Sequence, residues 1–257
     1  MILSVLFLFQ CSYTKKVDID FKEAGEDVSH EAWSELLQKH LKSGFMDYEG
    51  MQERRQELQA YLEYLGNNPP HREEWTQEEQ IAYWINLYNA ATVELVLRHY
   101  PVESIKDIGS KIAVPFVNTP FDISFIKVGE KELSLNNIEH GILRKYWEEP
   151  RIHFAINCAS FSCPALRNEA YNGETLNRQL DEQTRRFLQN DQLNRINPEA
   201  PQVSQIFSWF SGDFKKKSGT VINFINQYSK IRIKENADLE YIDYDWRLND
   251  AADFAEK

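Results

Sequence analysis

One long segment of this sequence is apolar on nearly every side when it is placed on a helix. It spans Gln77–His99 and contains the string AYWINLYNAATVELVL. Thr76 and Glu79 have the spacing of a helix-starting capping box, and Tyr100-Pro101 ends the segment, because proline interrupts helices. A helix with so little polar surface has to be covered by other elements. The sequence therefore predicts a fold built around one buried central helix.

The segments before and after this helix change their hydrophobic period. Helical spacing is expected for residues 30–65, 135–147, 164–190 and 219–229. Strand-like patterns cover residues 112–117, 121–128, 131–133 and 151–157, and Gly129-Glu130 is expected to form a hairpin turn. We therefore predict an α+β fold, in which the central helix packs on a small, mostly antiparallel sheet with flanking helices.

The N-terminal sequence bears on the compartment. The string MILSVLFLFQ directly precedes Cys11. Ten residues are too few for a membrane-spanning helix, which needs about 20, but the length suits the apolar part of an export signal. An apolar run that ends in cysteine resembles a bacterial lipoprotein signal, in which Cys11 is acylated. The alternative is a short buried strand or helix.

These patterns predict the organisation of the chain. We expect a signal segment at 1–16, a helical N-terminal arm at 17–74, a core domain at 75–250 and a tail at 251–257. The expected location is the cell envelope, with the membrane reached only through a lipid anchor at Cys11. The net charge of −11 argues against nucleic acid as a partner, because an acidic chain repels phosphates.

The chemically distinctive residues lie between Ser134 and Pro164. Cys163 precedes Pro164, which is typical of a helix start, and Cys158 lies in the turn before it. The positive end of a helix lowers the pKa of a nearby thiol. We expect Cys158 to be the reactive thiol, since it directly follows a predicted strand and Cys163 would cap its own helix.

An imidazole is expected to take the thiol proton. His140 is the candidate base, and Glu139 or Asn157 is the candidate orienting group. Backbone N–H groups of the loop after Cys158 are expected to stabilise an oxyanion.

Other interpretations of the same residues stay open. The cysteines are alternatively buried small hydrophobes, or a disulfide in an oxidising compartment. A zinc site from Cys158, Cys163, His140 and His153 would lack the paired spacing of structural sites, so no metal or cofactor is predicted. His153 is either a hydrogen-bonded core residue or a base. Asn86 and Asn89 either bridge loops to the central helix or line a pocket beside the thiol.

Several strings in the chain resemble the domain of unknown function 547 family. They are AYWINLYNAATVELVL, SLNNIEHGILR, RIHFAINCASFSCPAL, VSQIFSWFSGDF and YIDYDWRLND, which cover roughly residues 75–250 in the family's order. The resemblance implies that motif positions are occupied by Asn86, Asn89, Glu139, His140, Arg144, His153, Asn157, Cys158, Ser160, Ser162, Cys163 and Pro164. The order of His140 and Asn157-Cys158 is also similar to circularly permuted papain-like hydrolases, and transglutaminase-like folds use the same residue types.

Two functions follow from this reading. The first is a cysteine-dependent hydrolase or acyl/amide transferase that acts on a peptide-like or acyl substrate. Its catalytic residues would be Cys158, His140 and Glu139, and its supporting residues Asn86, Asn89, His153, Asn157, Ser160, Ser162 and Cys163. The second is a non-catalytic module that binds a peptide or glycan in the same pocket. Thiol reactivity distinguishes them, because an activated thiol has a pKa below about 8.5.

Overall fold

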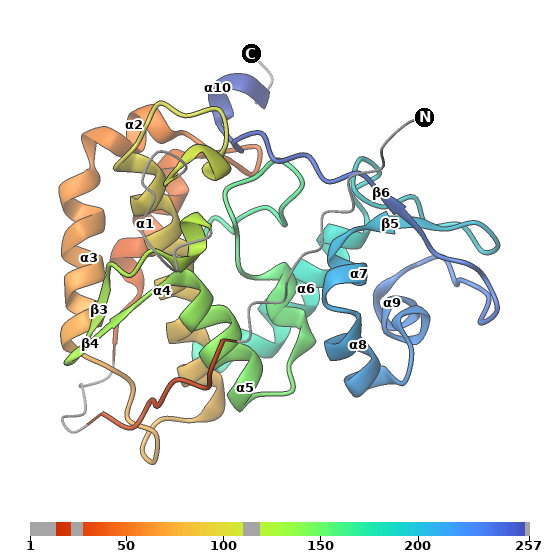
Figure 1. Ribbon diagram of the computed structural model, residues 1–257, viewed down its shortest axis with the longest axis horizontal. Coiled ribbons are helices and arrows are strands. Elements are labelled where there is room, and N and C mark those ends of the chain that lie inside the picture. The colour runs from red at the N-terminus through yellow and green to blue at the C-terminus, as the bar shows by residue number, and fades with distance from the viewer. Residues whose placement is uncertain (1–13, 22–27, 110–118, 255–257) are drawn as a thin grey trace, which may run out of the picture.

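The protein is described by a computed structural model that covers residues 14–21, 28–109 and 119–254 (Figure 1). The helices are α1 (Glu31–His40), α2 (Tyr48–Glu53), α3 (Arg55–Asn67), α4 (Gln77–Leu97), α5 (Arg144–Tyr146), α6 (Leu176–Leu188), α7 (Ile206–Trp209), α8 (Ser211–Ser218), α9 (Val221–Tyr228) and α10 (Ala251–Phe254). The strands are β1 (Leu41–Lys42), β2 (Phe45–Met46), β3 (Ile126–Val128), β4 (Lys131–Leu133), β5 (Gln202–Ser204) and β6 (Glu240–Ile242). The candidate lipidation site Cys11 and the predicted strand 112–117 lie outside the described residues.

Helix α4 is the central helix that the sequence predicts. The Thr76 hydroxyl accepts a hydrogen bond from the N–H of Glu79, and the Glu79 carboxylate accepts one from the N–H of Thr76, so the capping box is present. Every residue from Gln80 to Leu97 is buried. Helix α3 packs along α4. Figure 1 shows α4 between α3 on the left and α6 on the right.

The α+β class is confirmed, but the strands form three separate pairs. β1 with β2 and β3 with β4 are antiparallel, whereas β5 with β6 is parallel. The predicted hairpin at Gly129 is present, and its register pairs Ile126 with Leu133. Strand β3 starts later than expected, because Pro120–Asp122 forms a 3-10 turn in which Asp122 bonds back to Thr119.

The predicted strand at 151–157 is wrong. Pro150–Phe154 is a 3-10 helix, which Pro150 starts and in which the Glu149 carboxylate accepts the N–H of Arg151. The alternation of Ile152 and Phe154 with His153 indicated one polar face, but all three side chains are buried. The prediction of helix over 164–190 holds only from Leu176 onward.

Two hydrophobic clusters make up the interior. The larger one joins Trp33 of α1 and Leu58 of α3 to α4, so the predicted N-terminal arm shares its core with the central helix. The smaller one contains Phe154 together with Phe207 and Phe224 from the α7–α9 region. Figure 1 shows α7, α8 and α9 grouped beyond α6, on the side away from α3.

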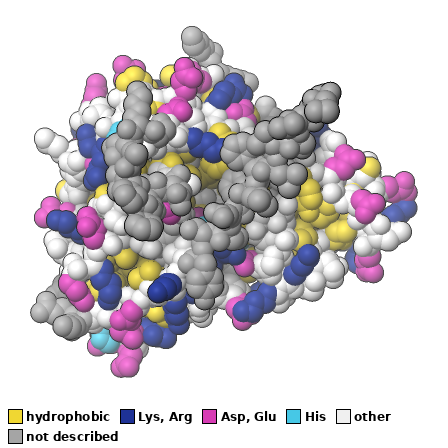
Figure 2. Space-filling model, in the orientation of Figure 1, with side chains coloured by type: hydrophobic (Ala, Val, Ile, Leu, Met, Phe, Trp, Pro, Cys, Tyr) yellow, Lys and Arg dark blue, Asp and Glu magenta, His cyan; other side chains and the backbone are white. Residues whose placement is uncertain are grey.

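The surface carries charges of both signs. Figure 2 shows acidic and basic side chains interspersed over the face that it presents. In the described part of the chain, no helix has both the length and the apolar character needed to cross a membrane.

We predict that Leu87→Ala lowers the free energy of unfolding by about 2–5 kcal/mol, because it empties a fully buried site on α4. Urea denaturation followed by circular dichroism measures this loss. Ile231→Ala is the control, since Ile231 is 47% exposed and its truncation removes little buried area. Equal stability of the Leu87→Ala and wild-type proteins would show that α4 is not the core of the fold.

Candidate functional site

The loop that carries both cysteines is fastened to the central helix. Asn89 of α4 donates its side-chain N–H to the Ala155 carbonyl at 3.0 Å and accepts the N–H of Asn157 at 2.8 Å. The Asn157 side chain accepts the N–H of Ala159 and donates to the Pro164 carbonyl, both at 2.8 Å. These amides therefore fix the loop at both ends.

The C-terminal segment lies against the same loop. Phe161 donates its N–H to the Arg247 carbonyl at 2.8 Å, and Ser162 exchanges two hydrogen bonds with the backbone of Asp245. Ser162 therefore has a structural role. This docking brings Tyr244, which is 86 residues away from Cys158 in sequence, next to the thiol.

Four side chains form what we call the cysteine cluster: Cys158, Ser160, Cys163 and Tyr244. The Cys158 sulfur lies 3.1 Å from Ser160 Oγ, 3.2 Å from the Tyr244 hydroxyl and 2.9 Å from the Cys163 sulfur. The N–H of Cys158 donates to Cys163 Sγ at 2.9 Å. Cys158 is partly exposed, whereas Cys163 is buried, and both are free thiols.

The two thiols differ in acidity. Burial alone would raise the pKa of Cys158, but hydrogen bonds from Cys163, Ser160 and Tyr244 outweigh it and lower that pKa to about 7. Burial raises the pKa of Cys163, and its hydrogen bond to Cys158 raises that pKa further. Burial also raises the pKa of Tyr244, which keeps the phenol protonated as a donor.

The physical cause of this activation differs from the predicted one. Pro164 starts no helix, so Cys163 is not an N-cap and no helix dipole reaches either thiol from there. Hydroxyl and thiol donors stabilise the thiolate instead.

The predicted oxyanion donors are also occupied. The N–H groups of residues 158–163 all have acceptors, namely Cys163 Sγ, Asn157 Oδ1, Cys158 Sγ and the carbonyls of Arg247, Asp245 and Ser160. The loop is thus built to hold the sulfurs and leaves none of these six N–H groups for a substrate oxygen.

The predicted histidines belong to a second group, the histidine cluster, which consists of Glu139, His140, Arg144, His153 and Asp213. Glu139 and His140 lie on a π-helical turn (Asn137–Leu143), a form that is common at functional sites. The Glu139 carboxylate is 3.8 Å from His140 Nδ1 and 4.0 Å from His153 Nδ1.

His153 is a buried, hydrogen-bonded core residue. Its Nε2 is 2.8 Å from Asp213 Oδ2, and its ring stacks on Phe210 at 3.8 Å. Burial lowers the pKa of His153. Burial would raise the pKa of Asp213, but its hydrogen bonds with His153 and Arg144 lower that pKa far below its usual range.

His140 does not contact the cysteine cluster through a hydrogen bond in the described structure. Arg144 is 3.0 Å from His140 Nδ1, and a guanidinium only donates, so Nδ1 is the acceptor and the neutral ring carries its proton on Nε2. A ring nitrogen occupied in this way is not free to take the proton of Cys158. In the described structure, the hydrogen-bond partner of His140 Nδ1 is therefore Arg144 rather than Cys158.

Tyr88 contacts the histidine cluster through Glu139. Its hydroxyl lies 3.4 Å from Glu139 Oε2. Burial raises the pKa of Tyr88, and the charges of Glu139 and of both cysteines raise it further, which places this phenol within electrostatic reach of both clusters. Across the described residues, no group of three or more His, Cys, Asp or Glu side chains is arranged to hold a metal ion.

Asn86 has a bridging role like that of Asn89. It binds both backbone groups of Tyr171, at 2.8 and 2.9 Å. Neither asparagine lines the cleft that opens beside the cysteine loop. Both amides therefore fasten loops to α4 rather than contacting a ligand.

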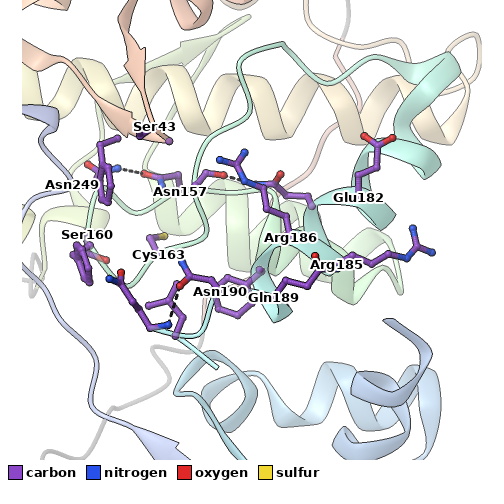
Figure 3. Close-up of a pocket in the computed structure, with 18 residues that line it drawn as sticks. Ser43, Asn157, Ser160, Cys163, Glu182, Arg185, Arg186, Gln189, Asn190 and Asn249 are labelled. Carbon is purple, nitrogen blue, oxygen red and sulfur yellow. Dashed lines mark hydrogen bonds between the residues drawn. The ribbon is translucent and has the colours of Figure 1, made fainter. Parts of the chain in front are cut away.

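A cleft of about 670 Å³ opens beside the cysteine loop. Figure 3 shows Ser160, Cys163 and Asn157 on one side of it, with Arg185 and Arg186 of α6 on the other. Cys158 is not among the lining residues, so the cleft reaches the cysteine cluster through Cys163 and Ser160.

Two groups near the thiol were not predicted to have a role. Tyr244 lies within the string YIDYDWRLND, which carries the family resemblance, but nothing in its local pattern points to a partner 86 residues away. Lys106 stacks over Trp246 at 4.0 Å. Burial lowers the pKa of Lys106, and the charge of Cys158 partly offsets that effect.

Comparison with known proteins finds a family match for the segment that contains both cysteines and both histidines of the two clusters. Residues 72–188 match the family described as "Protein of unknown function, DUF547", so this segment is a domain of that family, as the sequence strings indicate. The match includes Cys158, Cys163 and His140 but ends before Tyr244 and Asp213. No curated protein and no solved structure matches the chain. The similarity to papain-like hydrolases stays a prediction.

We predict that iodoacetamide labels Cys158 with a half-maximal rate near pH 7, because the thiolate is the reactive form. Cys163 should stay unlabelled at that pH. Removing one donor in Tyr244→Phe should raise the pKa of Cys158 and slow labelling at neutral pH, by about tenfold for each pKa unit. Peptide mass spectrometry after brief labelling of reduced protein measures both rates.

Tyr241→Phe is the matched control, since Tyr241 is an exposed tyrosine three residues away. Its labelling profile should equal that of the wild type. Preferential labelling of Cys163, or an unchanged profile in Tyr244→Phe, would contradict the assignment.

Proposed function

We propose that this chain is a cysteine-dependent hydrolase or acyl/amide transferase of the cell envelope, with Cys158 as its nucleophile. The supporting observation is that the Cys158 sulfur lies within hydrogen-bond distance of three side chains and is still partly exposed. A thiol stabilised as thiolate near neutral pH needs no separate base to attack a carbonyl. Peptide-like and acyl compounds are the proposed substrates.

The reaction follows from the groups around the sulfur. The Cys158 thiolate attacks the carbonyl carbon, the bond to the leaving group breaks, and a thioester forms. Tyr244 is a protonated phenol at the sulfur and supplies the proton that the leaving group requires. Water or an amine then cleaves the thioester and returns a proton to the phenolate.

In this proposal the histidine cluster does not contact the reacting atoms. His140 and Glu139 are positioning residues, because Glu139 binds Tyr88 and His140 is held by Arg144. Lys106 is the proposed stabiliser of the oxyanion, since its charge interacts with that of Cys158.

The competing proposal is a binding module without catalysis. The cleft beside Cys163 supports it, because its lining combines polar and apolar side chains, which suits a peptide or glycan, and leaves Cys158 out. Acylation of the protein separates the two proposals.

We predict that the wild type releases a burst of nitrophenolate from nitrophenyl acetate and carries the acetyl group on Cys158. The burst should fall by more than about 10³-fold in Cys158→Ala, because the nucleophile is absent. Tyr241→Phe, which changes an exposed tyrosine, is the control and should keep the burst. Stopped-flow absorbance gives the rate, and peptide mass spectrometry locates the acetyl group. A reactive thiol that is never acylated would support the binding module.

The envelope location is tested separately. If Cys11 is acylated, Cys11→Ser should abolish lipid labelling and move the protein from the membrane fraction to a soluble or unprocessed form. Metabolic labelling with an alkyne fatty acid, followed by fractionation, measures this change. Recovery of the wild type without lipid and with Met1 intact would contradict the proposed anchor.

A further inference from the structure

The second thiol is not the nucleophile in the proposed acyl transfer, yet the structure places it closer to Cys158 than either hydroxyl. The two sulfurs are 2.9 Å apart, and Cys158 is the more exposed of the two thiols. A disulfide bond needs sulfurs at about 2.05 Å. Only a small side-chain movement therefore separates these thiols from bond formation.

We propose that Cys158 and Cys163 form a redox-active dithiol that reduces low-molecular-weight disulfides. The inference rests on the proposed function only in using Cys158 as the attacking thiol. The exposed cysteine attacks the substrate, and the buried one completes the exchange, as accessible thiols next to a resolving cysteine do.

The exchange balances without a further reactant. The Cys158 thiolate attacks one sulfur of the substrate, forms a mixed disulfide and expels the first thiolate. Cys163 then loses its proton to solvent and attacks the Cys158 sulfur, which expels the second thiolate. The product thiolates take up protons from solvent. The dithiol is oxidised by two electrons, and the substrate disulfide is reduced to two thiols.

The surroundings of Cys163 favour this second step. Burial and the neighbouring Cys158 sulfur raise the pKa of Cys163 in the reduced protein. In the mixed disulfide Cys158 carries no charge, so its charge no longer raises the pKa of Cys163. The N–H of Cys158 still points at Cys163 Sγ from 2.9 Å and stabilises its thiolate.

The backbone holds the pair in this arrangement. Ala159 adopts a left-handed conformation (φ 59°), which is uncommon for a residue with a Cβ and often marks functional loops. Its N–H is accepted by Asn157, and its carbonyl accepts the N–H of Asn249 at 3.2 Å. The loop therefore folds back far enough for Cys163 to reach Cys158.

The recessed position of Cys158 determines the size of the substrate. Tyr244 touches its sulfur and packs against Trp209 and Trp246, with ring centroids 4.7 Å away in each case. These large rings beside a partly buried thiol favour a small disulfide over one on the surface of a folded protein.

The test uses the aryl disulfide dithiobis(nitrobenzoate) on reduced full-length protein with Cys11→Ser, so that only Cys158 and Cys163 react. We expect about two equivalents of nitrothiobenzoate per chain, no retained aryl group and a mass lower by two hydrogen atoms. Non-reducing peptide mapping should link Cys158 to Cys163. An aryl group that persists on Cys158, or on both cysteines, would overturn the proposal.

Variants in the same background separate the two steps. Cys163→Ser should release about one equivalent and keep the aryl group on Cys158, and Cys163→Ala serves as a second variant. The nitrophenyl acetate burst is measured in parallel. If Cys158 is acylated by nitrophenyl acetate but its mixed disulfide with the aryl group persists, only the redox activity is refuted. If the mixed disulfide resolves rapidly but no acylation occurs, only the proposed function is refuted.

Discussion

Because α4 is buried from Gln80 to Leu97, its carboxylate and amide side chains bind partners inside the protein. Glu94 is fully buried and binds Arg55 and Arg98, so its pKa stays low although burial would raise it. The same holds for Asn86 and Asn89, whose amides bind the backbone of distant loops. The polar groups of α4 therefore determine where these loops lie.

The cysteine loop depends directly on this constraint. Asn89 holds Ala155 and Asn157 on α4, and Asn157 in turn holds Ala159 and Pro164. The reactive loop is thus attached to the buried central helix α4, although it contains no regular secondary structure itself. A nucleophile gains from fixed geometry, and here hydrogen bonds from buried amides provide it.

The sequence predicts those parts of the fold that local patterns encode. The capping box at Thr76 and the apolar period identify α4 within two residues of its end, and Gly129 identifies the β3–β4 hairpin. The alternation of apolar and polar residues at 151–157 led to the wrong prediction of a strand. His153 is the polar residue in this pattern, yet it is buried against Phe210 and Asp213. An alternating pattern cannot show that such a polar residue also faces the core.

The candidate site is predictable only in part, for a similar reason. The cysteines and their neighbours Asn157 and Ser160 lie in one string, so the sequence indicates them together. Tyr244 and Asp213 reach their clusters from the C-terminal half, and no local pattern encodes those contacts. The proximity of His140 to Cys158 in sequence suggested a pair, but Arg144, one helical turn away, occupies the imidazole.

The thiolate of Cys158 is stabilised by neutral donors. Tyr244, Ser160 and Cys163 carry no charge when they donate, and burial also keeps Tyr88 and Tyr48 protonated nearby. Such donors act over hydrogen-bond distances, whereas an exposed ion pair acts at longer range and is screened by salt. Reactivity at Cys158 therefore depends on contact geometry, and one of those contacts exists only when the C-terminal segment is docked. Thiol acidity and the packing of residues 240–250 are thus physically coupled, although these residues lie outside the family-matched segment.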